Sequence, residues 1–341
     1  MSARRVPVIL TGVSSVTHLV YAASWLRSQL DTGVEIDLAI REPGTFVGRA
    51  RVLPRDITTY LPRDGRLRIT QDERAAYPGV SSTSPTLLCV GAPGLRTYVE
   101  LARRLRRLPR VVVVDEGIGS YGDVHTRLAA YRRAGGRGPW PAIRAAAVAG
   151  GLRTLTSERW TTYRRRGDST SGWEVNASVA AEFAGHLSGE PAPPRMAVYL
   201  TQPWPELGVM DAGDYLRHVR GVRAACQAVG LSLVVHPHPA DDATRYPGVD
   251  VRVQTRPVEL DRFVTSAAVV IGSNSTALLN LAALRNAPAV RVTMRQTQAL
   301  EDALSADQRE LLDHFLPPAV ATDALPAALV RAMDKTPPGL D

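Results

Sequence analysis

Short apolar runs, each followed by a turn and then by a helical pattern, constrain the fold of this chain more than any other feature. The clearest run is 110–116, which reads RVVVVDE and carries four consecutive valines. A strand that is apolar on both faces is typical of a parallel sheet covered by helices. Helices are expected between such strands, so the pattern predicts an α/β fold. Further strands are expected at 6–10, 34–40, 85–92, 196–202, 231–239, 249–254, 268–275 and 286–293.

A polar region rich in glycine, proline and serine interrupts this pattern at about 164–195. The chain has 341 residues, which is a comfortable length for two domains. We therefore expect a Rossmann-like domain at 1–190 that ends in a linker, and a second one at 196–341 whose last helix packs back on the first. Two doubly wound domains that face a central cleft bind ligands there, at the carboxyl ends of their strands.

The chain carries a formal net charge of +8, and nearly all of its basic residues are arginines, since Lys335 is the only lysine. A solvated, arginine-rich surface explains this charge most simply. An anionic partner, such as an acidic glycan or a membrane surface, is the alternative. No recognisable nucleic-acid motif accompanies the charge, so nucleic acid is not expected as a partner.

The two cysteines, Cys89 and Cys226, lie in an apolar strand pattern and on an amphipathic helical pattern, so both are expected in the core. This cysteine usage suits a reducing compartment. The first apolar run ends at Thr11, too early for a signal peptide, and no run approaches the length of a membrane span. A cytoplasmic protein is therefore expected, with peripheral membrane association left open.

The segment that follows the valine run contains two overlapping motifs. The three glycines of 117–122 have the G-x-G-x-x-G spacing of a dinucleotide-binding loop. The acidic pair Asp115 and Glu116 precedes them, however, where its charge would repel a phosphate. No Asp or Glu occurs at 124–157, so the acid that would hold the ribose is absent. The glycines instead predict a sharp turn that leaves the Asp115 side chain exposed.

A carboxylate at the end of a rigid strand can accept a proton from a substrate hydroxyl. Asp115 is the candidate for this role, with Glu116 as an auxiliary acid. The alternative is that one of these acids caps the next helix or pairs with an arginine.

Two histidines, His236 and His238, end a predicted strand in the segment VVHPHP, and a proline follows each of them. Proline fixes its own φ and restricts the preceding residue to extended geometry. A histidine held in this way can donate a hydrogen bond to a leaving phosphate, or protonate it. Metal binding competes with this interpretation, but residues two apart point to opposite faces of an extended chain. A structural role for the rings is the remaining alternative.

Small polar residues join the strand expected at 268–272 to an apolar helix. Serine and asparagine are good helix N-caps, and the backbone amides of a helix N-terminus form an anion site with nearby hydroxyls. The alternative is a plain cap without a ligand. The residues of this junction are Gly272, Ser273, Asn274, Ser275 and Thr276.

Several common catalytic motifs are missing from the sequence. It contains no D-x-D, no P-loop, no G-x-S-x-G and no zinc-ligand spacing. Neither a metal nor a cofactor is therefore expected. The chemistry that remains is an acid in the first domain, with a histidine and an anion site in the second.

These clusters resemble, in order and setting, those of bacterial sialyltransferases with the GT-B fold, especially the polysialyltransferase and lipooligosaccharide sialyltransferase families. The segments at 199–203 and 256–263 are also similar to that group, and the resemblance spans about residues 6–295. The shared marks are an acidic pair followed by glycine (Asp115, Glu116, Gly117), a His-Pro dipeptide (His238, Pro239) and a late Ser-Thr pair (Ser275, Thr276).

The resemblance implies an inverting, metal-independent transfer of sialic acid or a related nonulosonic acid from a CMP-activated donor. The acceptor would be a hydroxyl of a glycan or small molecule, anionic ones included. By analogy, Asp115 would be the general base, and His238 would protonate or hydrogen-bond the departing CMP phosphate. Glu259 would bind hydroxyls of the nucleoside. Further donor contacts would come from Thr201, Gln202, Gly272, Ser273, Asn274, Ser275 and Thr276.

Two other functions fit the same residues. A CDP-polyol phosphotransferase of the teichoic-acid polymerase type also combines a His-Pro dipeptide with a Ser/Thr site. A non-catalytic nucleotide-sugar-binding protein would keep the donor site without the chemistry.

Overall fold

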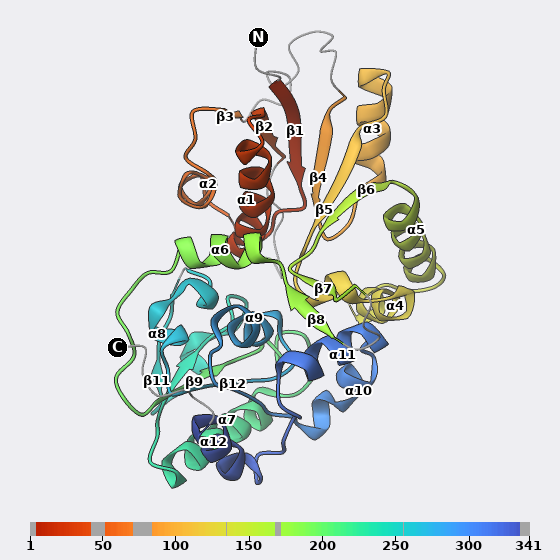
Figure 1. The fold of residues 1–341 in the computed structure, drawn as a ribbon. Helices are drawn as coiled ribbons and strands as arrows, with labels where there is room; N and C mark the ends of the chain where they lie inside the picture. Colours follow the sequence, from red (N-terminus) through yellow and green to blue (C-terminus); the bar gives the residue numbers. More distant parts are fainter. Residues whose placement is uncertain are drawn as a thin grey trace. The chain divides into compact units, whose positions relative to one another are not determined.

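The computed structural model describes residues 5–41, 52–70, 84–133, 135–167, 172–254 and 256–334. It divides the chain into two compact domains, Met1–Gly185 and His186–Asp341 (Figure 1). Each domain contains a parallel sheet with helices packed on it, so the α/β class that the sequence predicts is confirmed.

Six parallel strands form the sheet of the first domain, in the order β3-β2-β1-β4-β5-β6. The winding direction of the chain reverses between β1 and β4, and doubly wound domains bind ligands at such a switch point. The strands are β1 (Arg5–Thr11), β2 (Glu35–Ile40), β3 (Leu67–Thr70), β4 (Thr86–Val90), β5 (Arg110–Val114) and β6 (Thr156–Trp160), followed by an antiparallel ribbon of β7 (Tyr163–Arg165) and β8 (Trp173–Val175).

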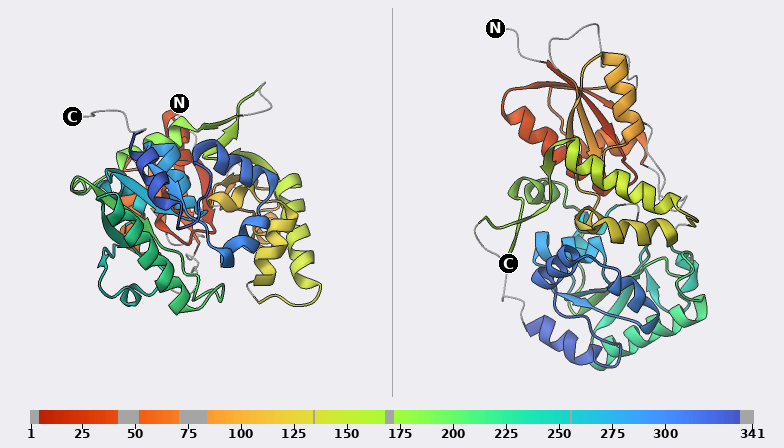
Figure 2. Two further views of the ribbon diagram at one scale, coloured as in Figure 1. Left: turned by 90° about the horizontal axis from the view of Figure 1, so that it is seen from below. Right: turned by 90° about the vertical axis from the view of Figure 1, so that its right-hand side faces the viewer.

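Helices lie on both sides of this sheet (Figure 2). On one face, Ile9, Cys89 and Val111 pack with Leu101 in a buried cluster. Val112 and Val114, which point to the other face, are also fully buried, so the valine run of β5 has no polar face. The helices are α1 (Val16–Asp31), α2 (Pro54–Tyr60), α3 (Leu95–Leu105), the 3-10 turn η1 (Ile118–Tyr121), α4 (Val124–Arg133), α5 (Trp140–Thr154) and α6 (Ala177–Gly185).

The second domain has five parallel strands in the order β11-β10-β9-β12-β13. Its winding direction reverses between β9 and β12, which makes that pair the second switch point. The strands are β9 (Met196–Leu200), β10 (Ser232–His236), β11 (Asp250–Val251), β12 (Val269–Gly272) and β13 (Ala289–Arg291).

One face of this second sheet packs against the apolar sides of two helices, through a cluster that includes Tyr199, Val219, Val235 and Leu329. The elements between and after the strands are α7 (Ala212–Ala228), η2 (Ala243–Arg245), η3 (Val258–Leu260), α8 (Arg262–Thr265), α9 (Thr276–Arg285), η4 (Arg295–Thr297), α10 (Gln298–Asp302), α11 (Ala306–Phe315) and α12 (Leu325–Asp334).

One expectation about the domain organisation needs correction. The region at 164–195 is not a plain linker, because it contains β8 and α6 of the first domain. Arg27 of α1 forms a two-point salt bridge with the buried Glu182 of α6, and this fixes α6 to its own domain. The last described helix, α12, packs within the second domain, since Leu325 and Leu329 are fully buried in the core of that domain. A contact of the last helix with the first domain stays a prediction.

Other details also follow from local chemistry. Cys89 and Cys226 are buried free thiols, as expected. The segment 258–265 forms two short helices, η3 and α8, because Asp261 between them adopts an extended conformation and its side chain caps the Phe263 amide. In the described part of the chain, no helix combines the length and the apolarity needed to cross a bilayer.

Candidate functional site

Asp115 follows the last residue of β5 and is buried, with 2% of its surface exposed. Its Oδ2 accepts hydrogen bonds from the Tyr121 hydroxyl (2.7 Å) and from the Thr162 amide (2.6 Å). The Tyr121 oxygen in turn accepts a hydrogen bond from the Tyr163 amide at 2.9 Å. The expectation of an exposed Asp115 is therefore wrong, because these bonds draw the carboxylate inward and tie β5 to the segment between β6 and β7.

Burial raises the pKa of Asp115 to about 6, although the bonds from Thr162 and Tyr121 stabilise its carboxylate. The ordinary value for an aspartate is 3.8. The folded protein therefore holds a proton that the unfolded chain has released between about pH 4 and about pH 6. Because the folded state binds more protons in this window, the free energy of unfolding falls as the pH rises through it.

Replacing Asp115 by Asn is expected to remove this pH dependence, since the amide cannot ionise and its oxygen can accept the same two hydrogen bonds. A pKa difference of about two units corresponds to about 3 kcal/mol. Urea unfolding from about pH 4 to about pH 7 measures the effect, with Asp31→Asn, which replaces an exposed carboxylate at the end of α1, as the matched control. An unchanged pH slope in Asp115→Asn would mean that the buried carboxyl titrates normally.

Glu116, the second acid of the pair, is the one that faces solvent. Its side chain is 37% exposed, and its Oε1 lies 3.9 Å from the Arg127 guanidinium. Its partial burial raises the pKa of Glu116, and the Arg127 charge opposes that rise. The partly buried His18 ring bonds to the Glu116 backbone carbonyl, and burial lowers the pKa of His18 to about 4. Glu116 thus combines an accessible carboxylate with a backbone that is held in place.

Glycines give the Glu116 carboxylate its position. Gly91 follows β4 with a φ of 74°, and a Cβ there would lie 2.2 Å from Glu116 Oε2. A Cβ at Gly119 would lie 2.8 Å from Oε1. Gly117 has a φ of 108°, which a residue with a side chain adopts only with strain. The carboxylate therefore leans from β5 over the end of β4, beside the switch point of the first sheet.

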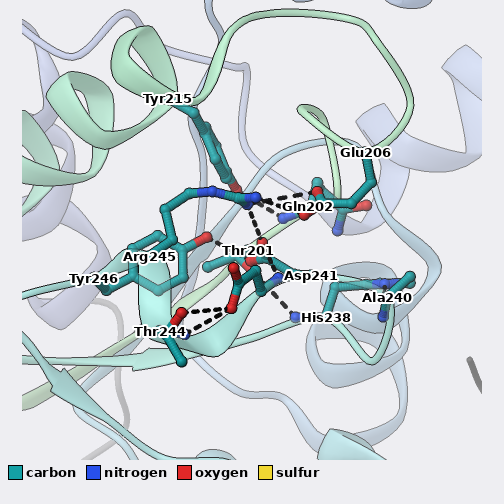
Figure 3. Close-up of polar contacts among 11 residues, drawn as sticks. Thr201, Gln202, Glu206, Tyr215, His238, Ala240, Asp241, Thr244, Arg245 and Tyr246 are labelled. Carbon is teal, nitrogen blue, oxygen red and sulfur yellow. Dashed lines mark hydrogen bonds and ion pairs between the residues drawn. The ribbon is translucent and has the colours of Figure 1, made fainter.

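In the second domain, the Thr201 hydroxyl joins the ends of β9 and β10 (Figure 3). Its oxygen accepts a hydrogen bond from the His238 amide at 3.0 Å, and the hydroxyl donates to Asp241 Oδ2. The Asp241 side chain is fully buried, and its Oδ1 pairs with the Arg245 guanidinium. The Tyr246 hydroxyl donates a further hydrogen bond to Asp241 Oδ2. A buried ionic network therefore holds the His-Pro loop, in addition to its prolines.

The ring of the half-buried His238 has a defined protonation state. Its Nδ1 accepts a hydrogen bond from the Ala240 amide at 3.1 Å, so the neutral ring carries its proton on Nε2. Burial lowers the pKa of His238 to about 4, and the Glu206 carboxylate, which Arg245 binds at 2.6 Å, opposes this shift. At neutral pH the ring is therefore an uncharged donor through Nε2–H.

His236, the last residue of β10, has a different environment from His238. It is buried, with 6% of its surface exposed, and this burial lowers the pKa of His236. Among the described residues, no hydrogen-bond partner reaches its enclosed Nε2. Of the two histidines, His238 is therefore the one with a ring edge at the surface of the domain.

Ser275 caps α9, and its side chain accepts a hydrogen bond from the Leu278 amide at 3.2 Å. Gly272 ends β12, and the partly exposed Thr276 begins the helix. The Ser273 hydroxyl and the Asn274 Oδ1 are both enclosed and have no hydrogen-bond partner among the described residues. Buried polar atoms without partners are rare, so these two, next to a helix N-terminus, indicate a polar ligand.

A pocket of about 330 Å³ opens beside Asn274, entirely within the second domain. Its charged wall includes Arg309, which is exposed, and Arg291, which is bound to the Pro317 carbonyl and to Asp313. Its apolar wall consists of Leu312 of α11 together with Leu304 and Leu316, which lie just before and just after that helix. This pocket provides room for a small polar ligand at the carboxyl edge of the sheet.

The remaining predicted donor contacts have mixed outcomes. Glu259 is buried, its Oε1 accepts a hydrogen bond from Asn280 at 2.9 Å, and burial raises the pKa of Glu259. A carboxylate enclosed in this way does not reach a nucleoside hydroxyl, so its expected role is corrected to a structural one. Gln202 is partly exposed, and its backbone amide donates a hydrogen bond to the Tyr215 hydroxyl at 2.7 Å. Pro239 is exposed.

The sequence interpretation missed Asp241 and Arg245, which support the His-Pro loop, and Gly91, which admits the Glu116 carboxylate. A signal for the first two was present, because paired acids follow the histidines directly in HPHPADD. For Gly91 the sequence contains a strand ending in glycine, but nothing in it indicates which side chain would fill the space.

No family model and no curated protein matches the chain. Among solved structures, it is similar to a putative UDP-N-acetylglucosamine 2-epimerase from Listeria monocytogenes, with a TM-score of 0.56, 8% identity, and 98% of this chain and 89% of that one covered. An α/β-galactoside α-2,3-sialyltransferase from Photobacterium phosphoreum gives a TM-score of 0.50 and 9% identity, with 94% and 99% covered. A spinosyn forosaminyltransferase gives a TM-score of 0.46 and 16% identity, with 98% of this chain and 91% of that one covered.

The chain has the GT-B fold. The similarities to the 2-epimerase and to the sialyltransferase cover nearly the whole chain. The two doubly wound parallel sheets are those expected of this fold. At such low identities, similarity extends to the fold alone, so the function has to be argued from the residues at the two switch points.

Proposed function

We propose that this protein is an inverting glycosyltransferase that moves sialic acid or a related nonulosonic acid from a CMP-activated donor to an acceptor hydroxyl, without a metal ion. The observation that carries the proposal is a complementary pair of polar sites, each beside a switch point. The first domain presents the accessible acid Glu116. The second presents the donor His238 after β10 and, after β12, a Ser273 hydroxyl that has no hydrogen-bond partner among the described residues.

The second-domain site suits a compact anionic leaving group. His238 Nε2–H, the Ser273 hydroxyl and the N-terminal amides of α9 are all hydrogen-bond donors, and the helix end adds a partial positive charge. Fixed donors of this kind stabilise the charge that develops on a departing phosphate. The leaving group CMP carries a single phosphate group, which such a site can bind without a metal ion.

The first-domain site suits a general base. The acceptor oxygen attacks the anomeric carbon while the bond from that carbon to the CMP phosphate oxygen breaks, and the hydroxyl proton passes to a carboxylate. Asp115 carries the resemblance to known sialyltransferases, but it is buried and bound by Tyr121 and Thr162. We assign the base to Glu116, because its exposed carboxylate has room to reach a substrate hydroxyl.

Incubation of the protein with a panel of CMP-, CDP- and UDP-activated donors tests this function. Release of CMP from CMP-nonulosonic acids is expected, unaffected by a chelator, with the sugar appearing on an added acceptor. Transfer of a polyol phosphate from a CDP donor would identify the phosphotransferase instead. Turnover only of a UDP-sugar, or tight CMP binding without turnover for any acceptor tested, would contradict the proposal.

A further inference from the structure

Helices α4 and α5 lie side by side in the first domain (Figures 1 and 2). The first turn of α5 carries two exposed apolar side chains. Trp140 is 72% exposed and Ile143 is 51% exposed. Three residues apart on α5, they lie on the same side of the helix. Four exposed arginines surround this pair in the sequence, at the end of α4, in the connection and on α5. The α4–α5 tip is defined here as Arg132, Arg133, Arg137, Trp140, Ile143 and Arg144.

The charge around the α4–α5 tip has a single sign. The segment from Val124 to Ser157 contains six arginines and no Asp or Glu. In the described ranges, Arg132, Arg133 and Arg137 have no carboxylate within ion-pair distance. The Arg144 guanidinium instead lies 4.4 Å above the ring centre of Tyr131. The surface is therefore cationic and carries no acidic side chain of its own segment to balance it.

A tryptophan exposed to water among arginines that have no ion-pair partner in the described part of the chain fits an anionic lipid surface. Tryptophan has an apolar body and a polar N–H, and it partitions to the boundary between lipid headgroups and acyl chains. Arginines attract anionic lipids and lose that attraction within a Debye length of the surface. A protein partner would have to supply a hydrophobic pocket within a wholly acidic rim, whereas an anionic bilayer supplies both features everywhere on its surface.

We propose that the α4–α5 tip docks the first domain on an anionic lipid bilayer. Trp140 and Ile143 enter the headgroup region, and the arginines contact lipid phosphates. This binding is peripheral, and it does not depend on the glycosyltransferase function proposed above, because no residue of the two candidate sites takes part.

Co-sedimentation of the full chain with vesicles tests the docking. Vesicles of phosphatidylglycerol mixed with phosphatidylcholine are expected to bind the protein, and pure phosphatidylcholine vesicles to bind it at least about tenfold more weakly. Raising the salt from about 0.1 M to about 1 M should release most of it. The double variants Trp140→Ala/Ile143→Ala and Arg132→Glu/Arg133→Glu should each lose about tenfold or more in affinity for the anionic vesicles.

A matched control is Arg55→Glu/Arg63→Glu, which reverses two exposed arginines elsewhere in the first domain by the same amount. It should bind the anionic vesicles within about twofold of the original protein if the α4–α5 tip is the contact. Trp140→Phe gives an independent readout, because it should bind vesicles and yet lose most of the blue shift in tryptophan emission. Equal binding to both vesicle types, or unchanged binding by both α4–α5 tip variants, would overturn the proposal. So would binding to an acidic protein or nucleic acid without binding to anionic vesicles.

Discussion

Replacing Glu116 by Gln is expected to lower the rate of sugar transfer by about 10³-fold while leaving the affinity for CMP unchanged. A positioned general base typically contributes between about 10² and about 10⁴ in rate, and an amide of the same shape cannot accept the proton. The donor site is untouched, since its residues belong to the other domain. The rate of acceptor-dependent CMP release, measured beside calorimetric CMP binding, separates the two effects.

Two further variants distinguish a base from a structural acid. Asp115→Asn should keep transfer within about tenfold of the original rate, since Asp115 binds Tyr121 and Thr162 and does not contact substrate in this proposal. Gly91→Ala keeps the Glu116 carboxylate but forces it to move, because the added Cβ would lie 2.2 Å from Oε2. We expect it to lose activity while the protein stays folded. If Asp115→Asn were inactive and Glu116→Gln fully active, the base would be Asp115.

The sequence was sufficient to predict the parallel sheets, because their strands are apolar on both faces. After the exposed Arg110, the other four residues of β5 are buried valines, and β12 consists of Val269, Val270, Ile271 and Gly272, all buried. Such runs without a polar face are typical of strands covered on both sides. The strand β6, which reads TSERW, was not predicted. It lies at the edge of the first sheet, where one side is open and polar side chains are tolerated.

The sequence was not sufficient to decide which of the two acids, Asp115 or Glu116, faces the ligand. Successive residues of an extended chain point to opposite sides, so either acid could have faced the ligand. The orientation of each acid depends on contacts that are distant in the sequence. The Thr162 amide donates a hydrogen bond to Asp115, and Gly91, which has no side chain, leaves space for the Glu116 carboxylate. Similarly, a buried aspartate beyond the prolines, Asp241, determines the position of the His238 amide through Thr201.

His238→Ala is expected to reduce the transfer rate by about 10²-fold, through loss of one hydrogen bond to the departing phosphate. The protonation state decides the mechanism. With a pKa of about 4, about one ring in a thousand is protonated at pH 7, too few for an efficient general acid. Protonation would also place a hydrogen on Nδ1, against the Ala240 amide that donates to it. The neutral Nε2–H is therefore the group that acts in this proposal.

Three measurements test that role. His238→Gln carries an N–H donor of similar reach and should recover part of the rate, whereas a general acid would not be replaced by an amide. The contribution of His238 should be present above its pKa of about 4 and be lost as the pH falls through it, because only the neutral ring leaves Nδ1 free to accept the Ala240 amide. Thr201→Val, which removes the hydroxyl that accepts the His238 amide, should lower kcat more than it raises KM. A wild-type rate that falls above about pH 6.5, with a fall that disappears in His238→Gln, would instead identify a protonated histidine as the acid.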